Sequence, residues 1–214
     1  MKKIVDIYKK YGIDSLLTVH QMRVASIAWQ ICDGINIKVS KNDIILACLF
    51  HDMGNIIKYD FIHFIEQYEK EGLEYWKNVQ KEFITKYGLN EHTATLMIGK
   101  EIGLSPEIIE LIVGMDSKIM EKIYLSDSFD LKICKYADLR AAPRSVVSIN
   151  ERMEEAKKRY EGHRNAFDAE QRKLFKINLE KIEKQIFSYT KIKPEDINDE
   201  SIKDYLEKLK NFSI

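Results

Sequence analysis

The chain has 214 residues, of which 45% are hydrophobic and 32% are charged, a composition typical of an ordinary globular protein. Lys and Arg together number 34, as do Asp and Glu, so the formal net charge is zero. A dedicated nucleic-acid binder usually carries a basic excess, so the balance disfavours nucleic acid as a partner. It also gives no electrostatic reason to expect binding to an anionic membrane surface.

The cysteines and the N-terminus indicate the cellular compartment. Cys32, Cys48 and Cys134 all lie in apolar stretches and form no CxxC motif, so we interpret them as small buried hydrophobic residues in a reducing compartment. No apolar run reaches the roughly 20 residues needed to span a bilayer. The segment Met1–Asp6 lacks the apolar core of a signal peptide. We therefore expect a cytoplasmic protein without membrane contact.

Helical spacing of apolar residues predominates along the chain, so the predicted fold class is all-α. No Asn-Gly or Asp-Gly dipeptide lies between alternating segments, as a hairpin would require. The first predicted helix covers residues 15–35, and the cluster Ser40–Asp43 caps a helix that contains the apolar run 44–50. Helical spacing then extends over 60–87 and ends at Gly88.

The helices that follow are each predicted from a polar residue suited to the N-cap position. Their starts, in chain order, are Asn90, with His92 in the first turn; Ser105-Pro106-Glu107, for a helix that ends near Gly114; Ser126–Ser128, for a helix that ends before Pro143; and Ser148, in a capping box with Glu151.

Beyond residue 163 the apolar pattern narrows to a seven-residue repeat flanked by Lys and Glu. The repeat consists of Phe175, Leu179, Ile182, Ile186 and Tyr189. We expect this seam to pack within the chain, the alternative being a contact in a homodimer. Pro194 interrupts the pattern before a last helix over about 199–211. The predicted organisation is a core domain of residues 1–162 and a C-terminal helical extension of residues 163–214.

Four residues, each expected on a helix, form a candidate ligand set for a divalent metal: His20, His51, Asp52 and Asp138. The doublet follows the apolar run 44–50, where a charge is costly unless it is paired or bound to a cation. An isolated histidine such as His20 is more often structural. The alternative for Asp138 is a buried ion pair with Arg140 or Arg144.

The order H…HD…D on an all-α chain resembles the HD-domain superfamily of metal-dependent phosphohydrolases. The similarity spans about Ser15 to Arg159 and includes the segments TVHQMRVASIA, LACLFHDMGN, NEHTATLMIGKEIGLSPEIIELI and KYADLRAAPRSVVSINERMEEAKKRY. The resemblance implies an HD-domain helical bundle in which His20, His51, Asp52 and Asp138 bind one divalent ion. The mixed nitrogen and oxygen donors suit Mn, Fe, Co, Ni or Zn better than Ca.

The resemblance also implies hydrolysis of a phosphate ester by metal-activated water, with Asp52 both binding the ion and accepting the proton of the water. His92 matches a position where many HD proteins carry another histidine. Members with two metals add further histidines, but residues 113–117 contain none, which favours one metal. Glu91 and His92 are then candidates to donate a proton or contact phosphate. The alternative is that His92 is stabilised at its helix start by Glu91.

Asn55 departs from the pattern of members that resemble 5′-nucleotidases, which often carry a glutamate at this position. An asparagine cannot transfer protons, so we assign it to substrate binding. Asp60 is the candidate that could contribute the acid–base group instead.

Three cations near the motifs are candidates to bind phosphate: Arg23, Lys58 and Arg144. Arg23 lies one turn after His20 on the same predicted helix. Surface ion pairing is the alternative for each of them, and it is the interpretation that we favour for Arg140.

The function predicted from these residues is hydrolysis of a small phosphorylated metabolite, with a nucleotide as the expected substrate. The alternative from another class is a non-catalytic HD module that binds a nucleotide and senses it. RNA-linked chemistry is a third option, against which the zero net charge and the lack of a basic and aromatic track both count.

Overall fold

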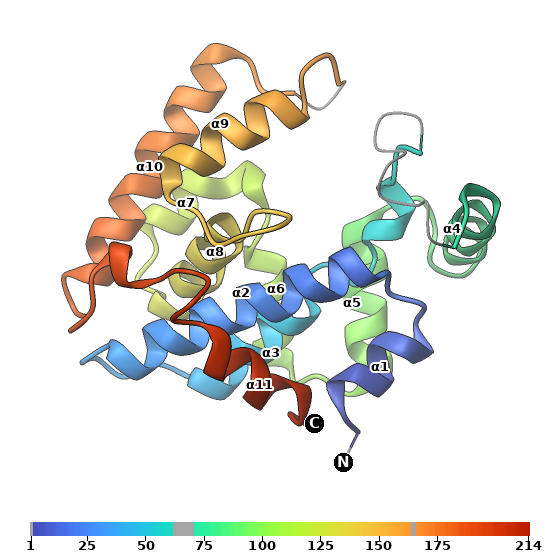
Figure 1. Ribbon diagram of the computed structural model, residues 1–214, viewed down its shortest axis with the longest axis horizontal. Helices are drawn as coiled ribbons and strands as arrows, with labels where there is room; N and C mark the ends of the chain where they lie inside the picture. Colours follow the sequence, from blue (N-terminus) through green and yellow to red (C-terminus); the bar gives the residue numbers. More distant parts are fainter. Residues whose placement is uncertain (1, 62–70, 164–165) are drawn as a thin grey trace.

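The computed structural model describes residues 2–61, 71–163 and 166–214, and every regular element in these ranges is helical (Figure 1). The first five α-helices are α1 (Ile4–Lys10), α2 (Ser15–Gly34), α3 (Lys41–Phe50), α4 (Leu73–Tyr87) and α5 (Glu91–Ile102). The next six are α6 (Pro106–Gly114), α7 (Met120–Leu125), α8 (Phe129–Arg140), α9 (Ile149–Arg159), α10 (Ala169–Phe187) and α11 (Lys203–Lys210). The 3₁₀ helices among the described residues are η1 (Asn55–Lys58), η3 (Ser117–Ile119) and η4 (Pro194–Asp196). The all-α prediction is confirmed.

Helix α2 crosses the middle of the molecule and packs on α3, α8 and α11 (Figure 1). The side chains of Val24, Ile27 and Ile31 on α2 are fully buried. Every residue of the run 44–50 on α3 is buried as well. Burying one such aliphatic side chain stabilises the fold by about 1.5–3 kcal/mol. The packing of α2 on α3 therefore fixes the place where α3 ends, which is where His51 follows.

Four of the predicted caps are present in the structure, one of them Ser128 at the start of α8. The Asn90 side chain accepts a hydrogen bond from the backbone N–H of Thr93 at 2.7 Å, at the start of α5. Ser105 caps α6 ahead of Pro106. Ser148 and the residue three positions later form a capping box at the start of α9. These caps satisfy backbone N–H groups that a helix start leaves without partners.

Other expectations differ in their boundaries. Ser40 precedes α3, but its side chain makes no capping hydrogen bond, and its backbone N–H instead donates to the carboxylate of Asp130 at 3.2 Å. The stretch predicted as helical over 60–87 includes residues 62–70, which lie outside the described residues, and α4 begins at Leu73. The short helices α1 and α7 were not predicted. Each spans two turns or fewer, too little for a periodic pattern.

The predicted apolar seam packs within the chain, because α10 contacts α7, α8 and α9. Phe175, Leu179, Ile182 and Ile186 are buried, whereas Tyr189 lies beyond the end of α10 and is 42% exposed. The boundary between 1–162 and 163–214 and the homodimer stay predictions.

The two ends of the chain meet in the fold. Lys2 and Ile214 exchange two backbone hydrogen bonds, of 2.9 and 3.1 Å. The sequence-based interpretation of Arg140 as a surface ion-pairing residue is wrong, because its side chain is buried. It donates hydrogen bonds to the carbonyl oxygens of Pro194 and Ile197 at 3.1 and 3.0 Å. These bonds attach the C-terminal segment to α8. None of the helices in the described ranges combines the length and the apolar character needed to cross a bilayer.

Candidate metal centre

The His51-Asp52 doublet lies at the end of the buried helix α3 and not within it. His51 is the C-cap residue of α3, and Asp52 is in the turn that follows, which corrects the expectation that both lie on a helix. Nδ1 of His51 lies 2.8 Å from the carbonyl oxygen of Cys48, which can only accept a hydrogen bond. Nδ1 therefore carries a proton, and Nε2 is the ring nitrogen left to bind a metal.

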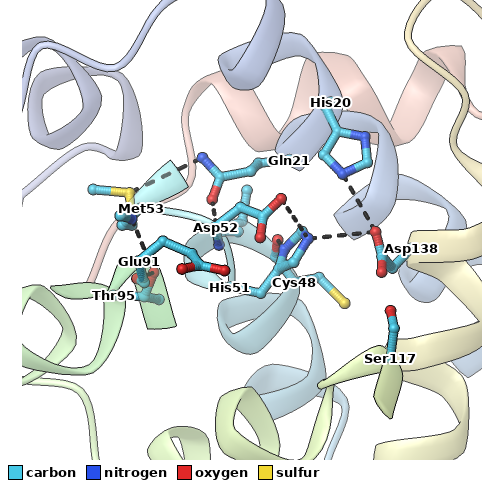
Figure 2. A network of polar contacts seen from close by, with 12 residues as sticks. His20, Gln21, Cys48, His51, Asp52, Met53, Glu91, Thr95, Ser117 and Asp138 are labelled. Atoms are coloured by element: carbon cyan, nitrogen blue, oxygen red, sulfur yellow. Dashed lines mark hydrogen bonds and ion pairs between the residues drawn. The ribbon is translucent and has the colours of Figure 1, made fainter. Parts of the chain in front are cut away.

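Two histidines and two carboxylates converge at this point (Figure 2). Oδ1 of Asp138 is 3.4 Å from Nε2 of His20 and 3.5 Å from Nε2 of His51, and Oδ2 of Asp52 is 3.6 Å from the same atom of His51. One ligand atom from each of His20, His51 and Asp52 fits within a group whose members are all within 4.8 Å of one another. The structure thus brings together all four predicted ligands, from α2, the end of α3 and α8.

These spacings suit a bound cation better than direct hydrogen bonds. Hydrogen bonds between nitrogen and oxygen are usually about 2.7–3.2 Å long. Ligand atoms that each lie about 2.0–2.2 Å from one ion are roughly 3–3.6 Å apart, for tetrahedral or octahedral arrangements. In addition, Nε2 of His51 is buried and has no hydrogen-bond partner among the described residues. A buried ring nitrogen that faces two carboxylates at these distances fits a site for a divalent metal ion.

The electrostatics of the four residues are strongly coupled. Burial lowers the pKa of His51, but Asp52 and Asp138 more than compensate and raise it to about 9. Burial favours a raised pKa for Asp138, yet Lys135 and the two histidines hold it well below its usual range. The pKa of Asp52 is also lowered, because His51 and Lys58 outweigh its burial. Both carboxylates are therefore ionised and available as ligands at neutral pH.

Asp138 has a buried cation as its partner, which sequence analysis did not identify. Nζ of Lys135 lies 2.9 Å from Oδ2 of Asp138 and 2.9 Å from Oγ of Ser117. Lys135 lies one helical turn before Asp138 on α8. The buried ion-pair partner of Asp138 is therefore Lys135, and not Arg140 or Arg144, the two alternatives considered from the sequence. The two oxygens of Asp138 are thereby divided between the lysine and the histidines.

The turn that carries Asp52 is held against α2 and α5. The backbone N–H of Asp52 donates to Oε1 of Gln21 at 3.3 Å, and that of Gly54 donates to Oγ1 of Thr95 at 2.9 Å (Figure 2). Gly54 is required there by close contact, since a Cβ atom would lie 2.2 Å from the carbonyl oxygen of Glu91. The doublet is thus fixed from two sides.

A cavity of about 240 Å³ opens onto the cluster, and His20, Asp52 and Asp138 line it. Of the other predicted site residues, three line the same cavity: Asn55, Lys58 and Asp60. The structure therefore brings these six side chains to one place. Their roles in binding and catalysis stay predictions.

The remaining predicted site residues are not among the described residues that line the cavity. Nη1 of Arg23 donates to the backbone carbonyls of Ala142 and Pro143 at 3.1 and 3.3 Å, so its side chain ties α2 to the segment after α8. Arg144 is exposed to solvent. Glu91 lies beside the turn that carries the doublet and pairs with Lys58 at 3.9 Å.

His92 is in the first turn of α5, as expected, and is also not among the described residues that line the cavity. The cavity lining also includes basic side chains that sequence analysis did not assign to the site, namely Arg152, Arg159 and His163. The two arginines are seven residues apart, a spacing that places them on one face of α9. The sequence shows that the two arginines share a helix face, but it does not show that this face is turned toward the cavity. Nε2 of His163 lies 3.6 Å from Oδ2 of Asp60.

The family assignment follows from the extent of one match. The HD domain family model matches residues 18–142, more than half of the chain, and this range includes all four residues of the cluster. The chain belongs to the HD-domain family. Searches among curated proteins and among solved structures each gave no match. HD domains are generally metal-dependent hydrolases, and the cluster of His20, His51 and Asp52 provides a place where this HD domain could hold a metal ion.

Proposed function

We propose that this protein is a metal-dependent phosphohydrolase that cleaves a phosphate ester of a small metabolite, with a nucleotide as the expected substrate. One observation carries the proposal: the buried Nε2 of His51 lacks a hydrogen-bond partner in the described part of the chain and faces two ionised carboxylates beside a cavity. His20, His51, Asp52 and Asp138 would hold the ion. When bound, a divalent ion supplies a water of lowered pKa and neutralises charge on phosphoryl oxygens.

The protein groups around the cluster divide the remaining tasks. Asp52 has a second carboxylate oxygen that can accept a proton, and its lowered pKa keeps it ionised for that purpose. Lys58 lines the cavity and places an ammonium group where a phosphate can bind. Asp60, with His163 3.6 Å away, can hold a proton for the leaving group. Asn55 can donate a hydrogen bond from its amide but cannot transfer a proton.

The alternative function, a module that senses a nucleotide without cleaving it, is favoured by one feature of the site. Asn55 lines the cavity, where nucleotidase-like relatives often have an acid. A module of this kind needs the metal and the cavity but no proton transfer at residue 55.

The test is a metal-resolved assay. The protein is stripped of metal, Mn, Fe, Co, Ni and Zn are added back separately, and phosphate release is measured for a panel of phosphorylated metabolites. We expect turnover with at least one metal. The Asp52→Ala variant should abolish it, and Asp43→Ala, an acid in the first turn of α3, should not. Full phosphatase activity in Asp52→Ala would overturn the mechanism. Saturable nucleotide binding without turnover under every metal would favour the sensing module.

A further inference from the structure

Helix α9 lines the candidate site, although it lies outside the range that matches the family. The match ends at residue 142, and α9 covers Ile149–Arg159. Arg152 and Arg159 line the cavity that opens onto the metal centre. Figure 1 shows α9 beside α10, and contacts with α8 and α10 hold it in place. The family-specific ligands and these arginines therefore share one cavity but come from different parts of the chain.

The two guanidinium groups are oriented by one acid between them. Glu155 contacts Nη1 of Arg152 and lies 2.7 Å from Nε of Arg159, at spacings of three and four residues along α9. The side chain of Arg152 is 12% exposed, and its Nε is buried without a hydrogen-bond partner in the described ranges. A guanidinium has five N–H donors. Arg152 therefore keeps donors for a ligand after its contact with Glu155.

The acids that line the cavity already have partners of their own. Asp14 accepts hydrogen bonds from the backbone N–H of Leu17, at 2.9 Å, and from the hydroxyl of Tyr59. Asp60 pairs with His163, and Asp52 and Asp138 belong to the metal centre. Arg152 is therefore not required to neutralise the cavity acids, and an anionic ligand is its natural partner.

We propose that Arg152, together with Arg159, binds a second anionic group of the substrate, distinct from the phosphate that is cleaved. The substrate class is then a phosphomonoester that carries another phosphate or a carboxylate. The cleaved phosphate is bound at the metal centre beside Lys58, and the second anion lies at α9. This inference rests on the proposed function and narrows its substrate.

The test compares pairs of compounds that differ by one anionic group. The pairs are glycerol 3-phosphate with 3-phosphoglycerate, and adenosine 5′-phosphate with adenosine 3′,5′-bisphosphate. We expect kcat/KM to be higher for the second member of a pair by on the order of 10- to 100-fold, the effect of a charge-assisted contact. Arg152→Gln and Arg159→Gln should each reduce that ratio about tenfold. Lys158→Gln, which removes an exposed charge from the same helix, should leave the ratio as it is.

Three outcomes would overturn the inference. One is a wild-type ratio near one for both pairs, and another is a ratio in Arg152→Gln equal to that of the wild type. The third is an equal loss for both members of a pair, which would place Arg152 on the phosphate that is cleaved. Thermal unfolding of each variant shows that it is folded before its ratio is interpreted.

Failure of the proposed function gives a different result. If no compound is cleaved under any metal, the hydrolase proposal fails, and the dissociation constants of the same four compounds are measured by isothermal titration calorimetry on metal-loaded protein. Tighter binding of the doubly anionic members, lost in Arg152→Gln, still supports the α9 subsite. Equal binding within each pair rejects it.

Discussion

Lys135 donates from its buried ammonium group to Oδ2 of Asp138, while Oδ1 of the same carboxylate faces His20 and His51. Lys135 is 2% exposed, and a charge so deeply buried is costly unless it is paired. The pairing determines which oxygen of Asp138 is available to a metal ion. Lys135 is in this sense a positioning residue for the candidate metal centre.

Replacing Lys135 with Met should weaken the affinity for a divalent metal by about 10- to 100-fold, the usual effect of removing a group that orients a ligand. Titration of metal-stripped protein with Mn²⁺ or Zn²⁺ in a calorimeter measures this change. Lys132→Met is the matched control, because Lys132 is an equally buried lysine of α8 whose Nζ lies over the ring of Phe129. Removing one partner of a buried pair costs about 3–5 kcal/mol, so circular dichroism must show that the variant is folded. A folded Lys135→Met protein with wild-type affinity would contradict this role.

The helix starts could be predicted from the sequence because capping is local. Asn90, Ser105 and Ser148 each satisfy a backbone N–H within three residues of themselves, so neighbouring residues suffice to indicate the cap. Ser40 shows the limit of this reasoning. Its place before α3 was predicted, but its backbone N–H is satisfied by Asp130, which is 90 residues away in the chain.

The candidate site was predictable to the same extent. His20, His51, Asp52 and Asp138 form a pattern whose residue types indicate the chemistry, and the structure brings them together. Lys135 and Arg152 could not be assigned in this way, because both lie on helices rich in charged residues. A lysine or arginine on such a helix is usually exposed to solvent. Only the packing of α8 and α9 decides that these two side chains face inward.

The raised pKa of His51 predicts that metal binding releases protons. With a pKa of about 9 in the metal-free protein, His51 carries a proton on Nε2 at pH 7, and that proton must leave before Nε2 can bind a metal. The apparent metal affinity should therefore increase about tenfold per pH unit between about pH 6 and 8. Calorimetry in buffers of different ionisation enthalpy counts the protons released. His92→Gln should keep this dependence, and metal uptake that does not vary with pH would contradict the assignment.

The same pKa affects the stability of the metal-free fold. A folded-state pKa of about 9, against about 6.5 in the unfolded chain, means that the protonated form of His51 stabilises the folded state. This contribution is fully present below about pH 6.5 and is lost as the pH rises through about 9. Urea unfolding of the metal-free wild type and of His51→Gln across this range should converge at high pH. Parallel pH profiles for the two proteins would show that His51 is not protonated in the fold.

Gly54→Ala should loosen the turn that carries the doublet. A Cβ atom at this position would lie 2.2 Å from the carbonyl oxygen of Glu91 and 2.8 Å from Cβ of Ala94, so the turn must move away from α5. We expect a loss of about 1–3 kcal/mol in the free energy of unfolding, measured by denaturant titration, together with weaker metal binding. Gly34→Ala is the control, since its Cβ would meet the flexible side chain of Ile192 at 3.2 Å. Equal effects of the two substitutions would show that contact with α5 does not hold the turn.

Arg23 and Lys58, both proposed from the sequence as phosphate contacts, should behave differently when replaced. Arg23→Met removes a buried guanidinium from the carbonyls of Ala142 and Pro143, so we expect a loss of about 1.5–3 kcal/mol in the free energy of unfolding. Lys58 is 46% exposed and lines the cavity, so Lys58→Gln should change stability by less than about 0.5 kcal/mol. Its effect should instead be a loss of about tenfold in kcat/KM for phosphate esters. Denaturant titration and steady-state kinetics on both variants make the comparison. A stable Arg23→Met protein with impaired kcat/KM would indicate that Arg23 does bind the phosphate. Unchanged kinetics in Lys58→Gln would reject a phosphate-binding role for Lys58.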